Sequence, residues 1–289
     1  MEAKRSHTTL LTQRFELALT PNAPLVMGIV NVTPDSFSDG GHYQHIETAL
    51  SHARRLLDEG ADILDIGGES TRPGAQPVDA KQEWERIGEL LTELVRWNVP
   101  ISVDTMKPEV MLNALHLGVD ILNDVNGFRA TGADQLLAES GAAGVVMHMQ
   151  GKPRTMQSDP VYNNVVKEVT AFLADRIDHL VKLGTKPQSL LVDPGFGFGK
   201  TLAHNQALFE ATSEFARLGA GVLVGVSRKR MIGAVTGRDQ AEERVHGSVA
   251  AALLAAQKGA AVVRVHDVGA TVDALKMLRW AGFSTDERQ

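Results

Sequence analysis

Ser189-Leu-Leu-Val-Asp-Pro-Gly-Phe-Gly-Phe-Gly-Lys200 joins a short apolar run to a glycine-rich loop. The run 189–192 is typical of a buried strand, and the carboxylate of Asp193 comes where that strand ends. Glycine lets a ligand approach the main chain closely, so we expect Phe196 and Phe198 to line a pocket and not the core. A strand-end carboxylate followed by such a loop predicts a binding site held by a rigid scaffold.

The same unit, an apolar strand followed by an amphipathic helix, recurs along the whole chain. Strands are predicted at 26–32, 62–67, 101–104, 121–124, 144–149, 190–193, 222–226 and 262–266. Helical spacing of apolar residues is found at 45–59, 79–97, 108–117, 134–140, 165–183, 205–218, 241–258 and 271–280. Eight strand–helix units predict an α/β fold, the (β/α)₈ TIM barrel. A doubly wound open sheet is the alternative.

Even spacing of the units, with no linker between them, favours the barrel as a single domain. We place the barrel at residues 25–284 and a short C-terminal tail at 285–289. Residues 1–24 are expected to form an N-terminal extension packed on the barrel, with a short hairpin covering its bottom.

The composition excludes several classes of protein. The 289 residues carry a net charge of -6 and include no cysteine. Disulfides and thiolate metal sites are therefore excluded, and no basic nucleic-acid-binding surface is indicated. No apolar run is as long as a membrane span, and the polar residues 1–13 lack the apolar core of a signal peptide. We expect a cytoplasmic protein that binds neither nucleic acid nor membrane.

Polar side chains gather at the predicted strand ends, where barrels bind their ligands. Taken singly they have ordinary explanations: Asp104 could cap a helix, and Lys229 could be a solvated charge. Arg264 and His266 share one face of a strand. An inward arginine is costly to bury unpaired, so a carboxylate or a ligand phosphate is its expected partner. We expect two separate groups, an acceptor group of Asp104, Asn123 and Asp193 and an anion-binding group of Lys229, Arg264 and His266.

Long ordered blocks of the chain resemble those of the dihydropteroate synthase family. They are Asn31-Val-Thr-Pro-Asp-Ser-Phe-Ser-Asp-Gly40, Gly67-Gly-Glu-Ser-Thr-Arg-Pro-Gly74, Ser102-Val-Asp-Thr105, Asn123-Asp124, Met147-His-Met-Gln-Gly151, Asp193 to Lys200, Ser227-Arg-Lys229 and Arg264-Val-His-Asp267. The resemblance implies a (β/α)₈ barrel, usually a homodimer, that acts in folate biosynthesis. Such an enzyme condenses 6-hydroxymethyl-7,8-dihydropterin diphosphate with 4-aminobenzoate, releases pyrophosphate and uses Mg²⁺. Sulfonamides compete with the aminobenzoate.

The resemblance also implies residue roles. The pterin falls to Asp104, Asn123, Asp193 and Met147, the diphosphate to Thr71, Arg264 and His266, the aminobenzoate to Pro73, Phe198 and Ser227, and Mg²⁺ to Asn31. Lys229 would reach the pterin carbonyl side and border the aminobenzoate site. Arg72 belongs to the same substrate-binding loop as its neighbours, and aminobenzoate affinity is expected to depend on Arg230. The catalytic set would be Lys229, Arg264, His266, Asp104 and Asp193. Acceptor-only carboxylates match the ring N–H and amino donors of a pterin.

Two alternatives share the pterin-binding acids. One is a folate-dependent methyltransferase acting on a corrinoid protein, which would have no use for the 71–73 loop or for an Arg264–His266 pair. The other is a paralogue that binds pterin without turnover and serves as a regulator. The presence of Lys229 and of the loops that follow the first and second predicted strands favours the synthase.

Overall fold

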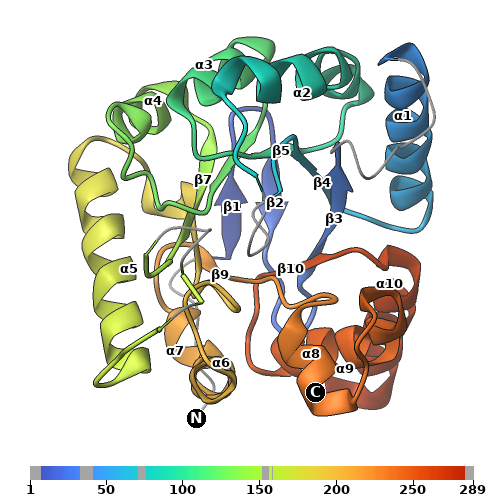
Figure 1. Ribbon diagram of the computed structural model, residues 1–289, viewed down its shortest axis with the longest axis vertical. Helices are drawn as coiled ribbons and strands as arrows, with labels where there is room; N and C mark the ends of the chain where they lie inside the picture. The colour runs from blue at the N-terminus through green and yellow to red at the C-terminus, as the bar shows by residue number, and fades with distance from the viewer. Residues whose placement is uncertain (1–7, 33–41, 71–75, 152–155, 158, 284–289) are drawn as a thin grey trace, which may run out of the picture.

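The computed structural model describes residues 8–32, 42–70, 76–151, 156–157 and 159–283. Eight parallel strands close into a barrel in the order β10-β3-β4-β5-β6-β7-β8-β9. The helices form a ring around it (Figure 1). The predicted (β/α)₈ barrel is therefore confirmed, and the open-sheet alternative is wrong because β10 pairs with both β3 and β9.

The strands are β1 (Thr9–Leu11), β2 (Glu16–Ala18), β3 (Leu25–Asn31), β4 (Ile63–Gly67), β5 (Ile101–Asp104), β6 (Ile121–Asp124), β7 (Ala143–Met147), β8 (Leu190–Asp193), β9 (Gly221–Val224) and β10 (Val262–Val265). The α-helices are α1 (His42–Asp58), α2 (Ala80–Leu94), α3 (Pro108–Leu117), α4 (Ala133–Ser140), α5 (Val165–Lys182), α6 (Leu202–Glu210), α7 (Thr212–Phe215), α8 (Arg230–Thr236), α9 (Val245–Gln257) and α10 (Val268–Leu278). Shorter helical turns are η2 (Val95–Trp97), η3 (Pro187–Ser189), η4 (Ala241–Arg244) and η5 (Arg279–Phe283).

Side chains of alternate strand residues pack into two apolar clusters. Val30, Val103 and Val192 belong to the cluster between the barrel and its helices. Met27 and Ile63 belong to a second cluster at the strand starts. Because this second cluster fills the N-terminal half of the barrel with apolar side chains, polar ligands are restricted to the opposite end.

The strands β1 and β2 form an antiparallel hairpin that covers the apolar end of the barrel. Leu10 and Leu19 pack in the same cluster as the strand starts. Arg14 lies in the hairpin turn between β1 and β2 and binds the fully buried Asp120, with Nη2 2.5 Å from Oδ2 and Nε 3.0 Å from Oδ1. The same guanidinium donates to the carbonyl oxygens of Val95 and Val99, so one side chain ties the extension to two strand–helix units.

Arg14→Met should therefore reduce the free energy of unfolding. The loss should be about 1.5–3 kcal/mol, the usual value for hydrogen bonds to charged groups. Urea unfolding followed by far-UV circular dichroism measures it. Arg96→Met is the matched control, because Arg96 pairs with Glu93 on the surface, where ion pairs contribute little. Equal stability losses in the two variants would contradict an anchoring role for Arg14.

Some helices differ from the predicted ranges. The range 205–218 holds two helices separated at Ala211, and the range 241–258 begins with the turn η4 before α9. Helix α8 was not predicted, since it is short and contains Gly233, a poor helix former. Glycine is required there because a Cβ at Gly233 would lie 2.4 Å from the carbonyl oxygen of Arg238. Among the described residues, no helix is long and apolar enough to span a bilayer.

Candidate active site

The three predicted acceptors lie at the carboxyl ends of their strands. Asp104 and Asp193 are the last residues of β5 and β8, and Asn123 precedes the last residue of β6. Asn123 and Asp193 are buried, and Asp104 is nearly so. Asn31 ends β3, and a Cβ on Gly67 would lie 3.5 Å from its Oδ1 and 3.6 Å from Asp104 Cβ. The side chains of Asn31 and Asp104 therefore converge on the same end of the barrel.

Arg264 joins this group through two ion pairs. Its Nε donates to Asp65 Oδ2 at 2.6 Å, and its Nη2 donates to Asp104 Oδ2 at 2.8 Å. The prediction of an anion partner left two possibilities, a carboxylate or a ligand phosphate, and carboxylates occupy this side of the guanidinium. The prediction of two separate groups is wrong, because the arginine of one group is paired with an acid of the other.

Asp65 is a site residue that the sequence reasoning missed. Its carboxylate is fully buried and accepts from Arg264 and, at 3.3 and 3.5 Å, from Asn123 Nδ2. In the barrel order, β4 lies two strands from β10 on one side and two strands from β6 on the other. Asp65 therefore links two predicted ligand-binding side chains that approach it from opposite directions.

The buried charges change one another's proton affinity. Burial raises the pKa of Asp104 to about 7, against the opposing effect of Arg264 and with a further increase from Asp65. Burial also raises the pKa of Asp193, which Lys229 lowers in turn. Burial lowers the pKa of Lys229 to about 8, although the nearby Asp193 raises it. Near neutral pH this end of the barrel therefore holds an acid and a base that can each change charge.

Lys229 and Phe198 form one wall of the site. The ammonium Nζ of Lys229 lies 4.7 Å from the centre of the Phe198 ring and donates to the Phe196 carbonyl at 2.6 Å. Phe198 packs beside a cluster formed by Val125, Met147, Met149 and Met156. The expectation that both phenylalanines face a pocket is wrong for Phe196, which is fully buried in the main core beside Phe209.

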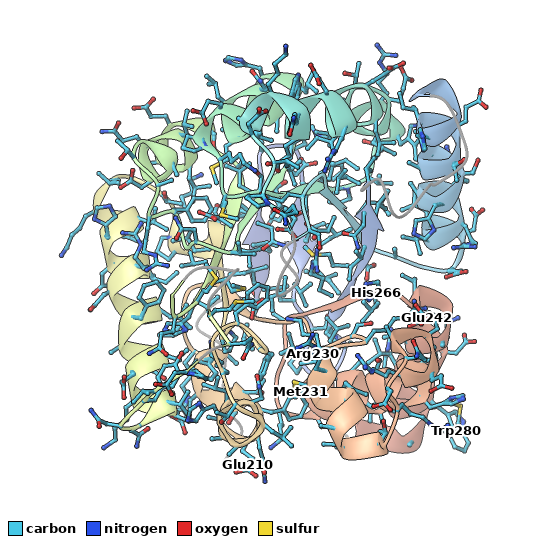
Figure 2. The ribbon with its side chains drawn as sticks, viewed as in Figure 1. Glu210, Arg230, Met231, Glu242, His266 and Trp280 are labelled. Carbon is cyan, nitrogen blue, oxygen red and sulfur yellow. The ribbon has the colours of Figure 1, made fainter. Side chains whose placement is uncertain are left out.

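The loops after β9 and β10 are joined by two parallel contacts. Ser227 Oγ lies 3.1 Å from His266 Nδ1, and the guanidinium of Arg228 binds both oxygens of Asp267 at 2.9 and 2.5 Å. His266 lies above the helices that follow these strands (Figure 2). Two residues predicted for different substrates, Ser227 and His266, are therefore in direct contact. The predicted loop residues Thr71, Arg72 and Pro73 lie outside the described residues.

The site and its barrel match known proteins along nearly the whole chain. A family model described as pterin binding enzyme matches residues 27–266. A dihydropteroate synthase of Neisseria meningitidis is 53% identical over 277 residues, which is 94% of this chain and 96% of the relative.

The chain belongs to the dihydropteroate synthase family of pterin-binding enzymes.

Solved structures of dihydropteroate synthases share the fold. That of Xanthomonas albilineans with 4-aminobenzoic acid has a TM-score of 0.89 and 48% identity, covering 96% of this chain and 98% of that one. That of Burkholderia cenocepacia complexed with 7,8-dihydropteroate has a TM-score of 0.88 and 45% identity, covering 98% of this chain and 99% of that one. These identities argue against the corrinoid methyltransferase and against a regulator without turnover.

The glycine-rich loop that joins β8 to α6 packs closely against the neighbouring strand. Gly195 has a φ of +71°, and a Cβ on it would lie 1.9 Å from the His148 carbonyl oxygen. Its N–H donates to Asp193 Oδ1 at 2.7 Å. Glycine is needed at this position because the loop backbone crosses the end of β7. The sequence had suggested a different reason, the close approach of a ligand to the main chain. This crossing holds Asp193 and places Phe198 beside the methionine cluster.

Proposed function

We propose that this chain condenses 6-hydroxymethyl-7,8-dihydropterin diphosphate with 4-aminobenzoate to give 7,8-dihydropteroate and pyrophosphate, a step of folate biosynthesis. The observation on which the proposal depends is the largely buried group of Asp104, Asn123, Asp193 and Arg264 at the open end of the barrel. The Xanthomonas and Burkholderia relatives were solved with the second substrate and the product of this reaction.

The acids hold the pterin end in this proposal. Ionised carboxylates are acceptor-only, and a pterin presents amino and ring N–H donors. Asp104, Asn123 and Asp193 supply these acceptors, and Met147 packs against the ring. The fixed negative charges also stabilise positive charge that develops on the pterin as its methylene loses the leaving group.

The reaction breaks the bond between the pterin methylene carbon and the diphosphate oxygen and forms a bond from that carbon to the amine nitrogen. The aromatic amine is neutral near pH 7, so its lone pair is available, and it loses a proton after the new bond forms. Departure of pyrophosphate is the harder step. Arg264 has five N–H donors and uses two for Asp65 and Asp104, which leaves three for the diphosphate. His266 faces the same end of the barrel.

The aminobenzoate enters beside Phe198, Ser227 and Lys229 in this proposal. The ring of Phe198 offers an apolar face, and Ser227 offers a hydroxyl next to His266. The exposed Arg230 lies close by at the start of α8 (Figure 2). The ring of the amine would thus lie between an apolar wall and donors for its carboxylate.

Mg²⁺ fits the donors at this end of the barrel. Among the described residues, no three acidic or histidine side chains form a metal site. Mg²⁺ is commonly held by one or two protein oxygens together with substrate phosphates, and the amide oxygen of Asn31 would be such a ligand. When bound, the ion would neutralise charge on the departing pyrophosphate.

Chelation should therefore stop pyrophosphate release. EDTA is expected to reduce the rate to near the uncatalysed level, and excess Mg²⁺ should restore it, because a hard oxygen-liganded ion is expected here. Pyrophosphate is measured by a coupled phosphate assay run with Mg²⁺ added only after the reaction is quenched. Full turnover in EDTA would contradict the metal assignment.

The reaction itself is tested by omitting each substrate in turn. Pyrophosphate release should require both the pterin diphosphate and 4-aminobenzoate, and 7,8-dihydropteroate should appear in equal amount by chromatography. A pterin-binding regulator would release no pyrophosphate. Release that does not depend on 4-aminobenzoate would count against the synthase.

The affinity for the pterin should depend on pH in a definite direction. Asp104 is an acceptor-only anion when it is ionised, above its pKa of about 7, and Lys229 donates with full charge only below its pKa of about 8. Binding of 6-hydroxymethyl-7,8-dihydropterin without the diphosphate should therefore be tightest between about pH 7 and 8 and should weaken on both sides. Calorimetry across the pH range measures this. Asp104→Asn should lose the acidic limb and Lys229→Met the alkaline limb; unchanged limbs would reject these assignments.

The proposed working form is a cytoplasmic homodimer, as the resemblance implies. Leu254 on α9, Met277 on α10 and Trp280 just beyond α10 expose 50%, 58% and 81% of their surface. Trp280 lies at the outer edge, away from the barrel (Figure 2). Exposed apolar side chains on neighbouring helices suit an interface between copies. Light scattering should give twice the mass of one chain, and Trp280→Glu should shift the equilibrium toward the monomer.

A further inference from the structure

Lys200 is a buried lysine whose amine already has all of its partners inside the protein. The residue is 3% exposed. Its Nζ lies 3.0 Å from the Phe198 carbonyl oxygen, 3.3 Å from the His148 carbonyl oxygen and 3.1 Å from His148 Nδ1. An ammonium has three N–H donors, so these three acceptors use them all. Lys200 therefore has no donor left for a substrate.

His148 is arranged to accept from this ammonium. Its ring is packed edge-on against Phe172 at 5.0 Å and lies 6.1 Å from Tyr162. Burial, together with the charge of Lys200, lowers the pKa of His148 to about 3. The imidazole is therefore neutral at physiological pH, and Nδ1 accepts when the ring proton is on Nε2. Burial also lowers the pKa of Lys200 to about 7, and the amine donates to a neutral acceptor, which offsets part of the cost of burying it.

The contacts of Lys200 are directed at one end of the loop that carries Phe198. Lys229 donates to the Phe196 carbonyl, and Lys200 donates to the Phe198 carbonyl two residues on. His148 directly follows the last residue of β7, and its N–H donates to the Asp193 carbonyl. Lys200 therefore fastens the segment around Phe198 to the rigid end of a barrel strand.

We propose that Lys200, together with His148, is a positioning residue that holds Phe198 in place for 4-aminobenzoate without touching either substrate. The inference rests on the proposed function, in which Phe198 borders the aminobenzoate. It assigns a role to the lysine that ends the glycine-rich stretch and to the histidine at the end of β7. Asp193 is held by a separate hydrogen bond from the Gly195 N–H, and Lys200 acts on it only through its charge, which lowers the pKa of Asp193.

The test separates the two substrates. In Lys200→Met the carbonyls of Phe198 and His148 lose their donor, and KM for 4-aminobenzoate should rise by roughly tenfold or more, the usual effect of losing a charged hydrogen bond. KM for the pterin diphosphate and kcat should change less than KM for 4-aminobenzoate, since Lys200 acts on Asp193 only through its charge. Lys81→Met is the control. Among the described residues, Lys81 forms only an exposed ion pair with Glu85 at 3.8 Å. An equal rise in both KM values, or no rise, would overturn the inference.

Two substitutions at His148 isolate the acceptor. His148→Asn keeps an acceptor near the position of Nδ1 and loses the ring, whereas His148→Phe keeps the ring packing and loses the acceptor. The asparagine variant should retain a lower KM for 4-aminobenzoate than the phenylalanine variant. The reverse order would show that ring packing, not the Lys200 contact, matters. A crystal structure of Lys200→Met with the 195–199 backbone unmoved would also overturn the inference.

The inference and the proposed function fail differently. A wild-type enzyme that releases no pyrophosphate with both substrates would reject the proposed function. An active wild-type enzyme whose Lys200→Met variant loses both substrates equally would reject only the positioning role.

Discussion

Replacing Arg264 with glutamine should lower kcat/KM for the pterin diphosphate by on the order of 100-fold or more, the usual effect of losing a preorganised charged donor. Glutamine also leaves the buried carboxylates of Asp65 and Asp104 without the guanidinium that binds them at 2.6 and 2.8 Å, a costly loss. Because Arg264 opposes the burial that raises the pKa of Asp104 to about 7, removing it should raise that pKa further. The acidic limb of pterin binding should then move to higher pH.

This result would differ from the result expected for an arginine that binds only phosphate. If Arg264 contacted only the diphosphate, the pterin without diphosphate would bind the variant as it binds the wild type. The ion pair with Asp104 predicts weaker binding of both ligands at neutral pH, with partial recovery for the bare pterin at alkaline pH. Arg264→Lys restores a charge without the two-pronged geometry and should recover only part of the loss. A pH dependence identical to that of the wild type would contradict the coupling.

The fold could be predicted because each strand–helix unit carries its own local sequence signals. Pro108 at the start of α3 and Gly118 after its end bound that helix as the sequence indicated. Elements whose signals are weak were missed. Helix α8 is an example, because the glycine that its packing requires also lowers its helical propensity. Helix ends that depend on tertiary contacts, such as the break at Ala211, leave little trace in the sequence.

The candidate site was visible only where polar side chains interrupt the ends of apolar strands. Asp104, Asn123 and Asp193 stand there, and the structure brings them to one end of the barrel. Phe196 was misplaced because alternation in a loop does not reveal which ring turns inward. Lys200 looked like a loop cation, and only the crossing of the β8 loop over β7 shows that it is buried. Partners brought together by barrel closure cannot be read from spacing along the chain.

Asp65 is the clearest case, since it stands between Leu64 and Ile66 inside β4 and looks like an isolated charge in a buried strand. Asp65→Asn should lower kcat/KM by roughly 10–100-fold, the range expected when a charged hydrogen bond is lost. The amide that replaces the carboxylate must turn an N–H₂ group toward Arg264 or Asn123, both of which donate to Asp65. Two side chains of the proposed site would therefore shift together, although Asp65 itself is fully buried.

The pH dependence of this variant distinguishes it from the Arg264 variant. The negative charge of Asp65 adds to the burial that raises the pKa of Asp104, so removing that charge should lower the pKa and move the acidic limb of pterin binding to lower pH. Arg264→Gln should move the same limb in the opposite direction. Asp62→Asn is the matched control, because Asp62 accepts from the Val26 N–H at the far end of the barrel and an amide oxygen can do the same. Calorimetry with the bare pterin measures all three. Limbs that shift in the same direction for Asp65→Asn and Arg264→Gln would mean that the two side chains do not act on Asp104 as opposing charges, and that the buried network serves packing alone.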